Sequence, residues 1–167
     1  MSVFVESDIE FDFTKATSVI EHDKISGHGN SHWPGIDFCV EDAAGWIWLE
    51  VKSWDAGRFP ASRRGGQRWS FISKMRSSSY TKELRVKFLG TTAYLAWTGQ
   101  FTPAPTSFIL LFEPPAPIDA ALLVTQSHRI RSLIPNLSKW SHPIAAVVLP
   151  LAEWNARFPD YPARKVT

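Results

Sequence analysis

The sequence contains one cysteine among 167 residues, and this scarcity excludes several kinds of protein. A single thiol cannot form an internal disulfide, and it cannot build a zinc site from cysteines alone. Cys39 follows Phe38 in an apolar segment, so we expect it to be a small core residue rather than a nucleophile.

Long apolar runs are also absent. No stretch approaches the roughly 18 apolar residues of a membrane-spanning helix, and the first residues show no basic-then-apolar signal, so we expect a cytoplasmic protein without a membrane partner. Internal repeats, a glycine-rich phosphate-binding loop and a nucleophile elbow are missing too. With 44% hydrophobic and 20% charged residues, residues 1–167 are predicted to form a single globular domain.

The net charge of +2 hides a strong segregation of charge along the chain. Residues 1–55 contain eleven acidic residues and three lysines, whereas residues 56–82 contain seven basic residues and no acidic one. We expect the basic segment to be a loop that binds a phosphate backbone. A loop whose charges are merely solvated is the alternative.

Aromatic residues are common, with eight tryptophans. Trp69 lies inside the basic segment and is a candidate for stacking on nucleic-acid bases. Trp97, Trp140 and Trp154 occur in segments that we expect to be structural. The predicted nucleic-acid-binding residues are Arg58, Arg63, Arg64, Arg68, Trp69, Lys74 and Arg76.

The most informative stretch is a predicted β-hairpin between residues 34 and 55. Two short apolar segments are separated by Glu-Asp-Ala-Ala-Gly, a composition typical of a turn. Because side chains alternate along a strand, Ile47, Leu49 and Val51 should share one face, and Glu50 and Lys52 the other. Asp37, which opens the first strand, is then expected to lie close to Glu50. Two carboxylates and one lysine converge.

These residues resemble the motif of the PD-(D/E)XK nuclease superfamily, which consists of Pro and Asp, a spacer, and then Asp or Glu, any residue and Lys. The matching residues are Pro34, Asp37, Glu50 and Lys52. The match departs from the motif at Gly35 and Ile36, which separate the proline from the aspartate. The resemblance implies a DNA nuclease dependent on Mg²⁺ or Mn²⁺, acting alone, as a homodimer or in a larger assembly.

Such a cluster suits metal-assisted hydrolysis of a phosphodiester. Mg²⁺ commonly binds one or two carboxylates together with water and substrate phosphate. The expected ligands are Asp37, Glu50 and the backbone carbonyl of Val51, while Lys52 positions the attacking water or stabilises developing negative charge. The superfamily also often takes an acid from a helix before the hairpin, where Asp23 is one candidate ligand and Glu21 a second.

A catalytically silent binding or regulatory module is the alternative function, because a nuclease-like fold does not by itself imply catalysis. In that interpretation Glu50 and Lys52 form an ordinary ion pair on a strand surface. A metal site, in contrast, holds two carboxylates that repel one another when the metal is absent. The Glu50→Gln substitution is then expected to raise the melting temperature of the metal-free protein.

The remaining segments predict an α/β fold of the restriction-endonuclease-like type, a mixed sheet with helices on both faces. The resemblance covers residues 14–112, and residues 113–167 add a C-terminal helix and strand. The helix over 79–95 is expected to place Lys82, Arg85 and Lys87 on a cationic surface. The predicted elements are an extended segment at 3–12, helices at 14–24, 79–95 and 120–133, buried strands at 107–112 and 143–149, and a short turn or helix ending before Pro159.

Overall fold

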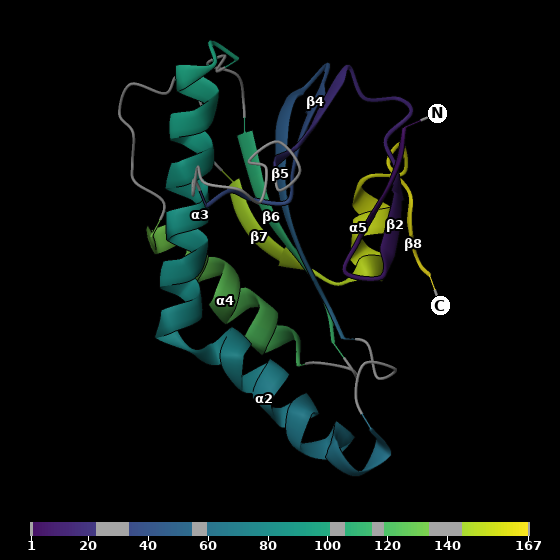
Figure 1. Cartoon of the computed structure of the whole chain (residues 1–167), viewed down its shortest axis with the longest axis vertical. Coiled ribbons are helices and arrows are strands. Elements are labelled where there is room, and N and C mark those ends of the chain that lie inside the picture. The colour runs from purple at the N-terminus through teal and green to yellow at the C-terminus, as the bar shows by residue number, and fades with distance from the viewer. Residues whose placement is uncertain are drawn as a thin grey trace.

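The computed structural model describes residues 2–22, 34–54, 60–100, 106–114, 119–133 and 145–166, without the side chains of residues 61, 64, 65, 68, 69 and 133. It has three layers, with a five-stranded sheet in the middle (Figure 1). Long helices cover one face of this sheet, and a smaller sheet and a short helix cover the other. Within the described ranges, no helix is both long and apolar enough to cross a membrane.

The central sheet is mixed and has the order β3-β4-β5-β6-β7. The β3, β4 and β5 strands pair antiparallel, and β5, β6 and β7 pair parallel. The hairpin and the strand at 107–112 are thus confirmed, and β7 lies at the edge of the sheet with only its last two residues fully buried. The strands are β3 (Ser18–Glu21), β4 (Phe38–Asp42), β5 (Gly45–Ser53), β6 (Thr106–Glu113) and β7 (Ala145–Leu149).

The turn between β4 and β5 is fixed by local chemistry. The Asp42 carboxylate accepts hydrogen bonds from the backbone N–H groups of Ala44 and Gly45, at 2.7 and 3.0 Å. Gly45 has a φ of 136°, a conformation that only glycine adopts readily. The turn therefore sets the register of the hairpin, which pairs Phe38 with Leu49.

One face of the sheet is covered by α2 (Arg64–Arg76), α3 (Ser78–Trp97) and α4 (Ala120–Leu133), with a 3₁₀ turn, η2 (Ala61–Arg63), before them. The predicted helices at 79–95 and 120–133 are confirmed. Ser77 caps α3 by accepting a hydrogen bond from the Tyr80 N–H, and Asp119 accepts one from the Ala121 N–H. These helices provide the crossovers that parallel strands need.

The expectation of helices on both faces is met only in part, because the described part of the opposite face is formed mainly by a second sheet with a short helix beside it. A three-stranded antiparallel sheet covers much of this face, with β1 (Val3–Glu6), β2 (Ile9–Asp12) and β8 (Ala163–Lys165). The predicted extended segment at 3–12 forms its first two strands. In β1 exposed and half-buried residues alternate, and in β2 buried and half-buried residues alternate. The short helix α5 (Leu151–Arg157) completes the layer and buries Trp154 fully among aromatic rings.

The predicted helix at 14–24 is wrong over its described part. Residues Ser18–Glu21 form β3, which pairs with β4 at the edge of the sheet. The backbone N–H groups of Thr17 and His22 bond to the Glu41 and Asp37 carbonyls, at 2.8 and 3.1 Å. β-Branched residues and serine are weak helix formers, and β4 of the hairpin provides a strand to pair with. The segment therefore forms a strand rather than a helix.

The described part of the basic segment, residues 60–82, is mostly helical rather than a loop, because η2, α2 and the first turn of α3 occupy it. Met75 of α2 is buried, and the ring of Phe71 stacks on Phe112 of β6 with centroids 5.1 Å apart. These apolar residues dock the helix on the sheet, which the charge count alone did not indicate. Trp97 lies in a structural segment, as expected, since it ends α3. Its side chain is 78% exposed, beyond the last buried residue of that helix, Leu95.

Candidate active site

Asp37 lies directly before β4 and is only 3% exposed. Its Oδ2 accepts a hydrogen bond of 2.6 Å from the backbone N–H of Val51 in β5. Asp37 is therefore held against the strand that carries the other predicted site residues. A buried carboxylate needs such partners, because removal from water is costly.

Glu50 is fully buried, at 0% exposure. It lies on the helix face of β5, since Leu49 and Val51 belong to the core on the other face. Its Oε1 is 2.7 Å from the Lys52 ammonium, and its two oxygens accept hydrogen bonds of 2.7 and 2.9 Å from the Lys87 ammonium.

Lys87 joins the two carboxylates. Its Nζ also lies 3.6 Å from Oδ1 of Asp37, so one ammonium contacts both acids. The structure thus brings Asp37, Glu50 and Lys52 together, as the sequence predicted, and adds a second lysine. The result is a buried cluster of two carboxylates and two ammonium groups. We call these four residues the charged quartet.

The position of Lys87 depends on how α3 docks on the segment before β4. Gly90 faces the Pro34 carbonyl, and the Thr91 hydroxyl accepts a hydrogen bond of 3.0 Å from the Ile36 N–H. Residues three and four apart share one face of a helix. The contacts at 90 and 91 therefore hold the side of α3 that carries Lys87 against the segment that carries Asp37.

The expectation that Lys87 extends a cationic surface is wrong. Its side chain is 18% exposed and points into the quartet, whereas Lys82 and Arg85 are exposed. A signal was present in the sequence, since Lys87 follows Leu84 by three residues and precedes Thr91 by four. A charged residue at the spacing of a buried face indicates a buried partner.

Lys52 is the more exposed lysine of the quartet, at 28%. Besides contacting Glu50, its ammonium donates a hydrogen bond of 3.0 Å to the Val51 carbonyl, the backbone group predicted as a metal ligand. Burial alone would lower the pKa of Lys52, but the negative charges of Glu50 and Asp37 outweigh it and raise this pKa. Lys52 is thus a cation at neutral pH.

Asp37 has a strongly shifted acidity. Burial, reinforced by the charge of Glu50, raises its pKa to about 7, against the opposing effects of Lys52, Lys87 and the Val51 N–H. At neutral pH this carboxylate is therefore near the midpoint of its titration, which is common at functional sites.

Tyr80 of α3 lies near the quartet. Its hydroxyl is buried and has no hydrogen-bond partner among the described residues. Burial and the charges of Glu50, Glu83 and Asp37 raise the pKa of Tyr80 well above its ordinary value, so the phenol stays neutral. The Lys74 ammonium lies 5.2 Å from the centre of its ring and thereby links the quartet region to α2.

The structure describes only some of the other predicted site residues. Arg63, Lys74 and Arg76 are exposed on η2 and α2. Glu21 lies on β3, paired with Phe38, rather than on a helix. The expected residues Asp23 and Arg58 and the side chains of Arg64, Arg68 and Trp69 lie outside the described residues, as does Trp140.

The carboxylates of Asp37 and Glu50 can hold only certain kinds of metal ion. Within the described ranges there is no group of three or more His, Cys, Asp or Glu residues placed to hold a metal. Mg²⁺, however, is often bound by only one or two carboxylates and completes its shell with water and phosphate. Asp37 and Glu50 already contact one shared cation, the Lys87 ammonium, so these two acids suit a small hard cation.

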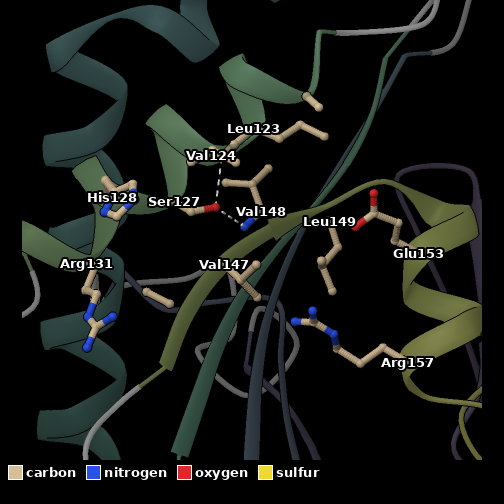
Figure 2. Close-up of a pocket in the computed structure, with 12 residues that line it drawn as sticks. Leu123, Val124, Ser127, His128, Arg131, Val147, Val148, Leu149, Glu153 and Arg157 are labelled. Carbon is tan, nitrogen blue, oxygen red and sulfur yellow. Dashed lines mark hydrogen bonds between the residues drawn. The ribbon is translucent and has the colours of Figure 1, made fainter.

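A separate hollow of about 270 Å³ lies where α4 and α5 flank the edge strand β7 (Figure 2). His128 and Arg131 approach it from α4, and Glu153 and Arg157 from α5. Inside it, the Ser127 hydroxyl accepts a hydrogen bond of 2.9 Å from the Val148 N–H. No residue of the charged quartet lines this hollow.

Comparison with known proteins gave no match to a family model, to a curated protein or to a solved structure.

Proposed function

We propose that this chain is a divalent-metal-dependent nuclease that hydrolyses phosphodiester bonds of DNA, with a restriction-endonuclease-like fold and a PD-(D/E)XK site. The observation that carries the proposal is the burial of Asp37 and Glu50 side by side, in contact with one shared ammonium. Burial and the charge of Glu50 raise the pKa of Asp37 to about 7, and buried carboxylates with perturbed acidity are common at active sites.

Each member of the site has a role that its position supports. Asp37, Glu50 and the Val51 carbonyl would hold Mg²⁺ or Mn²⁺, which supplies polarisation of the scissile phosphate and a more acidic water. Lys52 is the quartet lysine most open to solvent, and it lies beside Glu50 and the Val51 carbonyl. From there it orients the attacking water and neutralises charge that develops on the phosphate.

The basic residues of η2, α2 and α3 would bind the DNA backbone. Helix α3 carries both Lys87 of the quartet and the exposed cations Lys82 and Arg85. Helix α2 precedes it and exposes Lys74 and Arg76. Phosphates bound by this surface would be led towards the carboxylates, because clustered positive charge attracts nucleic acid from solution.

A binding or regulatory module is the second candidate, and one observation favours it. The two carboxylates are already balanced by two lysines, as in a structural ion-pair cluster. Such clusters occur in proteins without catalysis, where the fold alone does not assign an activity.

A nicking assay separates the two candidates. Supercoiled plasmid is incubated with the parent protein in Mg²⁺, in Mn²⁺ and in EDTA. The nuclease proposal predicts nicking that requires a divalent ion and falls at least about a hundredfold in Lys52→Ala, the usual scale for losing a positioned catalytic group.

The matched control is Lys15→Ala, which removes the same charge from an exposed position outside the proposed DNA-binding surface. It should keep most of the activity, and its purification by the same route controls for contaminating nucleases. A parent protein that does not cleave in either metal, or a Lys52→Ala protein that cleaves equally well, would refute the nuclease proposal.

A further inference from the structure

Lys87 occupies the position where a cation bound by both carboxylates would be expected. Its ammonium donates to both oxygens of Glu50 at 2.7 and 2.9 Å and lies 3.6 Å from Asp37 Oδ1. An ammonium has three N–H donors, and here two of them are directed at one carboxylate. No other described lysine or arginine forms an ion pair with Asp37.

We propose that Lys87 is a resident counter-cation of the Asp37–Glu50 pair, and that a divalent metal ion must displace its ammonium to bind there. Lys87 would therefore set how tightly the metal binds. This inference rests on the proposed function, since it assumes that the two carboxylates hold a metal. It goes beyond that function by naming a residue that controls metal occupancy.

Electrostatics makes the two cations mutually exclusive. An ammonium and a divalent ion that contact the same carboxylate oxygens would lie within a few ångströms of each other, where like charges in a buried site repel strongly. The quartet as it stands has two negative and two positive groups. Adding a divalent ion while Lys87 stays in place would leave an excess of positive charge in a buried region.

The fold allows the side chain of Lys87 to leave without moving its helix. A flexible stem of four carbon atoms separates its ammonium from the backbone, and 18% of the side chain is already exposed to solvent. The backbone of α3 at this turn is fixed by the Gly90 and Thr91 contacts. Displacement is then a rotation of one side chain, which exchanges its ion pairs for water.

Lys52 provides the comparison within the same site. Its ion pair is with Glu50, at one oxygen, and its other contact is the Val51 carbonyl. It lies beside the carboxylate pair rather than between the two acids. Removing its charge should therefore favour metal binding less than removing the charge of Lys87.

The first test measures Mn²⁺ binding by isothermal titration calorimetry, without any nucleic acid. Parent, Lys87→Met and Lys52→Met proteins are compared, since methionine keeps much of the length of lysine without its charge. We expect Lys87→Met to bind Mn²⁺ at least about tenfold more tightly than the parent, and clearly more tightly than Lys52→Met. A gain in Lys87→Met no larger than that in Lys52→Met overturns the inference.

The second test uses only the parent protein and so does not depend on how the variants fold. Lysines are acetylated with an excess of reagent for a short time, and modification is read by mass spectrometry at each position. Lys87 should be protected without metal and become several-fold more reactive in saturating Mn²⁺, while the exposed Lys82 keeps its reactivity. Unchanged labelling of Lys87 at a Mn²⁺ concentration that saturates the protein contradicts displacement.

Failure of the inference and failure of the proposed function give different results. If neither the parent nor Lys87→Met binds Mn²⁺, the carboxylates are not a metal site, and both proposals fall. If both proteins bind Mn²⁺ equally, the metal site stands and the role of Lys87 is refuted. If only Lys87→Met binds, the lysine blocks the site as inferred.

Discussion

The backbone carbonyl of Pro34 lies against Gly90 so closely that a Cβ atom at position 90 would be 1.9 Å from the carbonyl oxygen. No side chain fits at that distance, and backbone cannot move aside cheaply. Gly90 is therefore required for α3 to approach the segment that carries Asp37. Glycine in the middle of a helix normally destabilises the helix. At position 90 it allows α3 to pack directly against the backbone of Pro34.

The Gly90→Ala substitution should destabilise the protein, in contrast to the usual effect of replacing a helical glycine. We expect a loss of about 1–3 kcal/mol in the free energy of unfolding, the range for overpacking a buried contact. Urea unfolding followed by circular dichroism measures it. Metal-free conditions keep the comparison to packing alone.

Gly66 of α2 provides the matched control. It is exposed, and a Cβ atom there would meet nothing within 4 Å. Gly66→Ala should therefore stabilise by up to about 1 kcal/mol, from helix propensity alone. If both alanine variants are stabilised, α3 does not approach Pro34 as closely as the structure places it.

The contrast between predicted and unpredicted features follows from how local each feature is. The hairpin of β4 and β5 was predictable because its turn residues and alternating side chains are adjacent in sequence. The helix over 79–95 was predictable from its apolar spacing. The strand β3 was not, since residues 18–21 become a strand by pairing with β4, and the sequence shows no partner. Lys87 was misplaced for the same reason, because its partners are more than thirty residues away.

Asp37 predicts a pH dependence of stability. Its pKa is raised to about 7 in the folded protein, from an ordinary value of 3.8, so the folded state binds a proton that the unfolded state releases. Its contribution to stability is thus fully present below about pH 4 and is lost as the pH rises through about 7. In that interval the free energy of unfolding should fall by up to about 1.4 kcal/mol per pH unit because of this group.

The Asp37→Asn variant removes this titration while its amide oxygen can still accept the Val51 N–H. The stability of the parent relative to this variant should fall from pH 4.5 to pH 8, as measured by urea unfolding in EDTA. Asp12→Asn is the control, because hydrogen bonds from Thr14 lower the pKa of Asp12 and keep it charged throughout this range. Parallel curves for the parent and Asp37→Asn would show that Asp37 is not the titrating group.

The Glu50→Gln substitution should change stability in the direction opposite to the one expected from carboxylate repulsion alone. That expectation, a higher melting temperature for metal-free Glu50→Gln, considered Asp37 and Lys52 but not Lys87. In the structure Glu50 pairs with two ammonium groups and is fully buried. Losing its charge removes the ion pair of Lys52 and leaves Lys87 with Asp37 alone.

We therefore expect Glu50→Gln to lower the free energy of unfolding by roughly 3 kcal/mol, the lower end of the range for breaking a buried ion pair, since both lysines can turn towards water. Glu83→Gln is the matched control, because Glu83 pairs with Lys74 at 3.4 Å on the surface and should matter by less than about 1 kcal/mol. A Glu50→Gln protein as stable as its parent in EDTA would show that repulsion between the acids outweighs both ion pairs.

The basic surface of η2 and α2 predicts the salt dependence of DNA binding. If Arg63, Lys74 and Arg76 contact phosphates, each contact releases counterions and adds about 0.9 to the slope of log affinity against log salt concentration. The triple alanine variant should then bind duplex DNA more weakly. The slope of log affinity against log salt concentration should fall by about 0.9 for each of the three contacts that is lost. Fluorescence anisotropy in EDTA measures binding without cleavage.

A control of equal charge tests whether position matters or only net charge. Three exposed cations lie on the side of the molecule formed by the small sheet and α5. Arg157 belongs to α5 and Arg164 to β8, and Lys15 pairs with Asp160 between these two elements. Their triple alanine variant loses three positive charges as well, but from the face opposite α2 and α3. It should keep the slope of the parent, because counterion release counts contacts made with phosphate rather than the total charge. Equal losses of slope in the two variants would mean that DNA is attracted by net charge alone, and that α2 is not a specific backbone-binding surface.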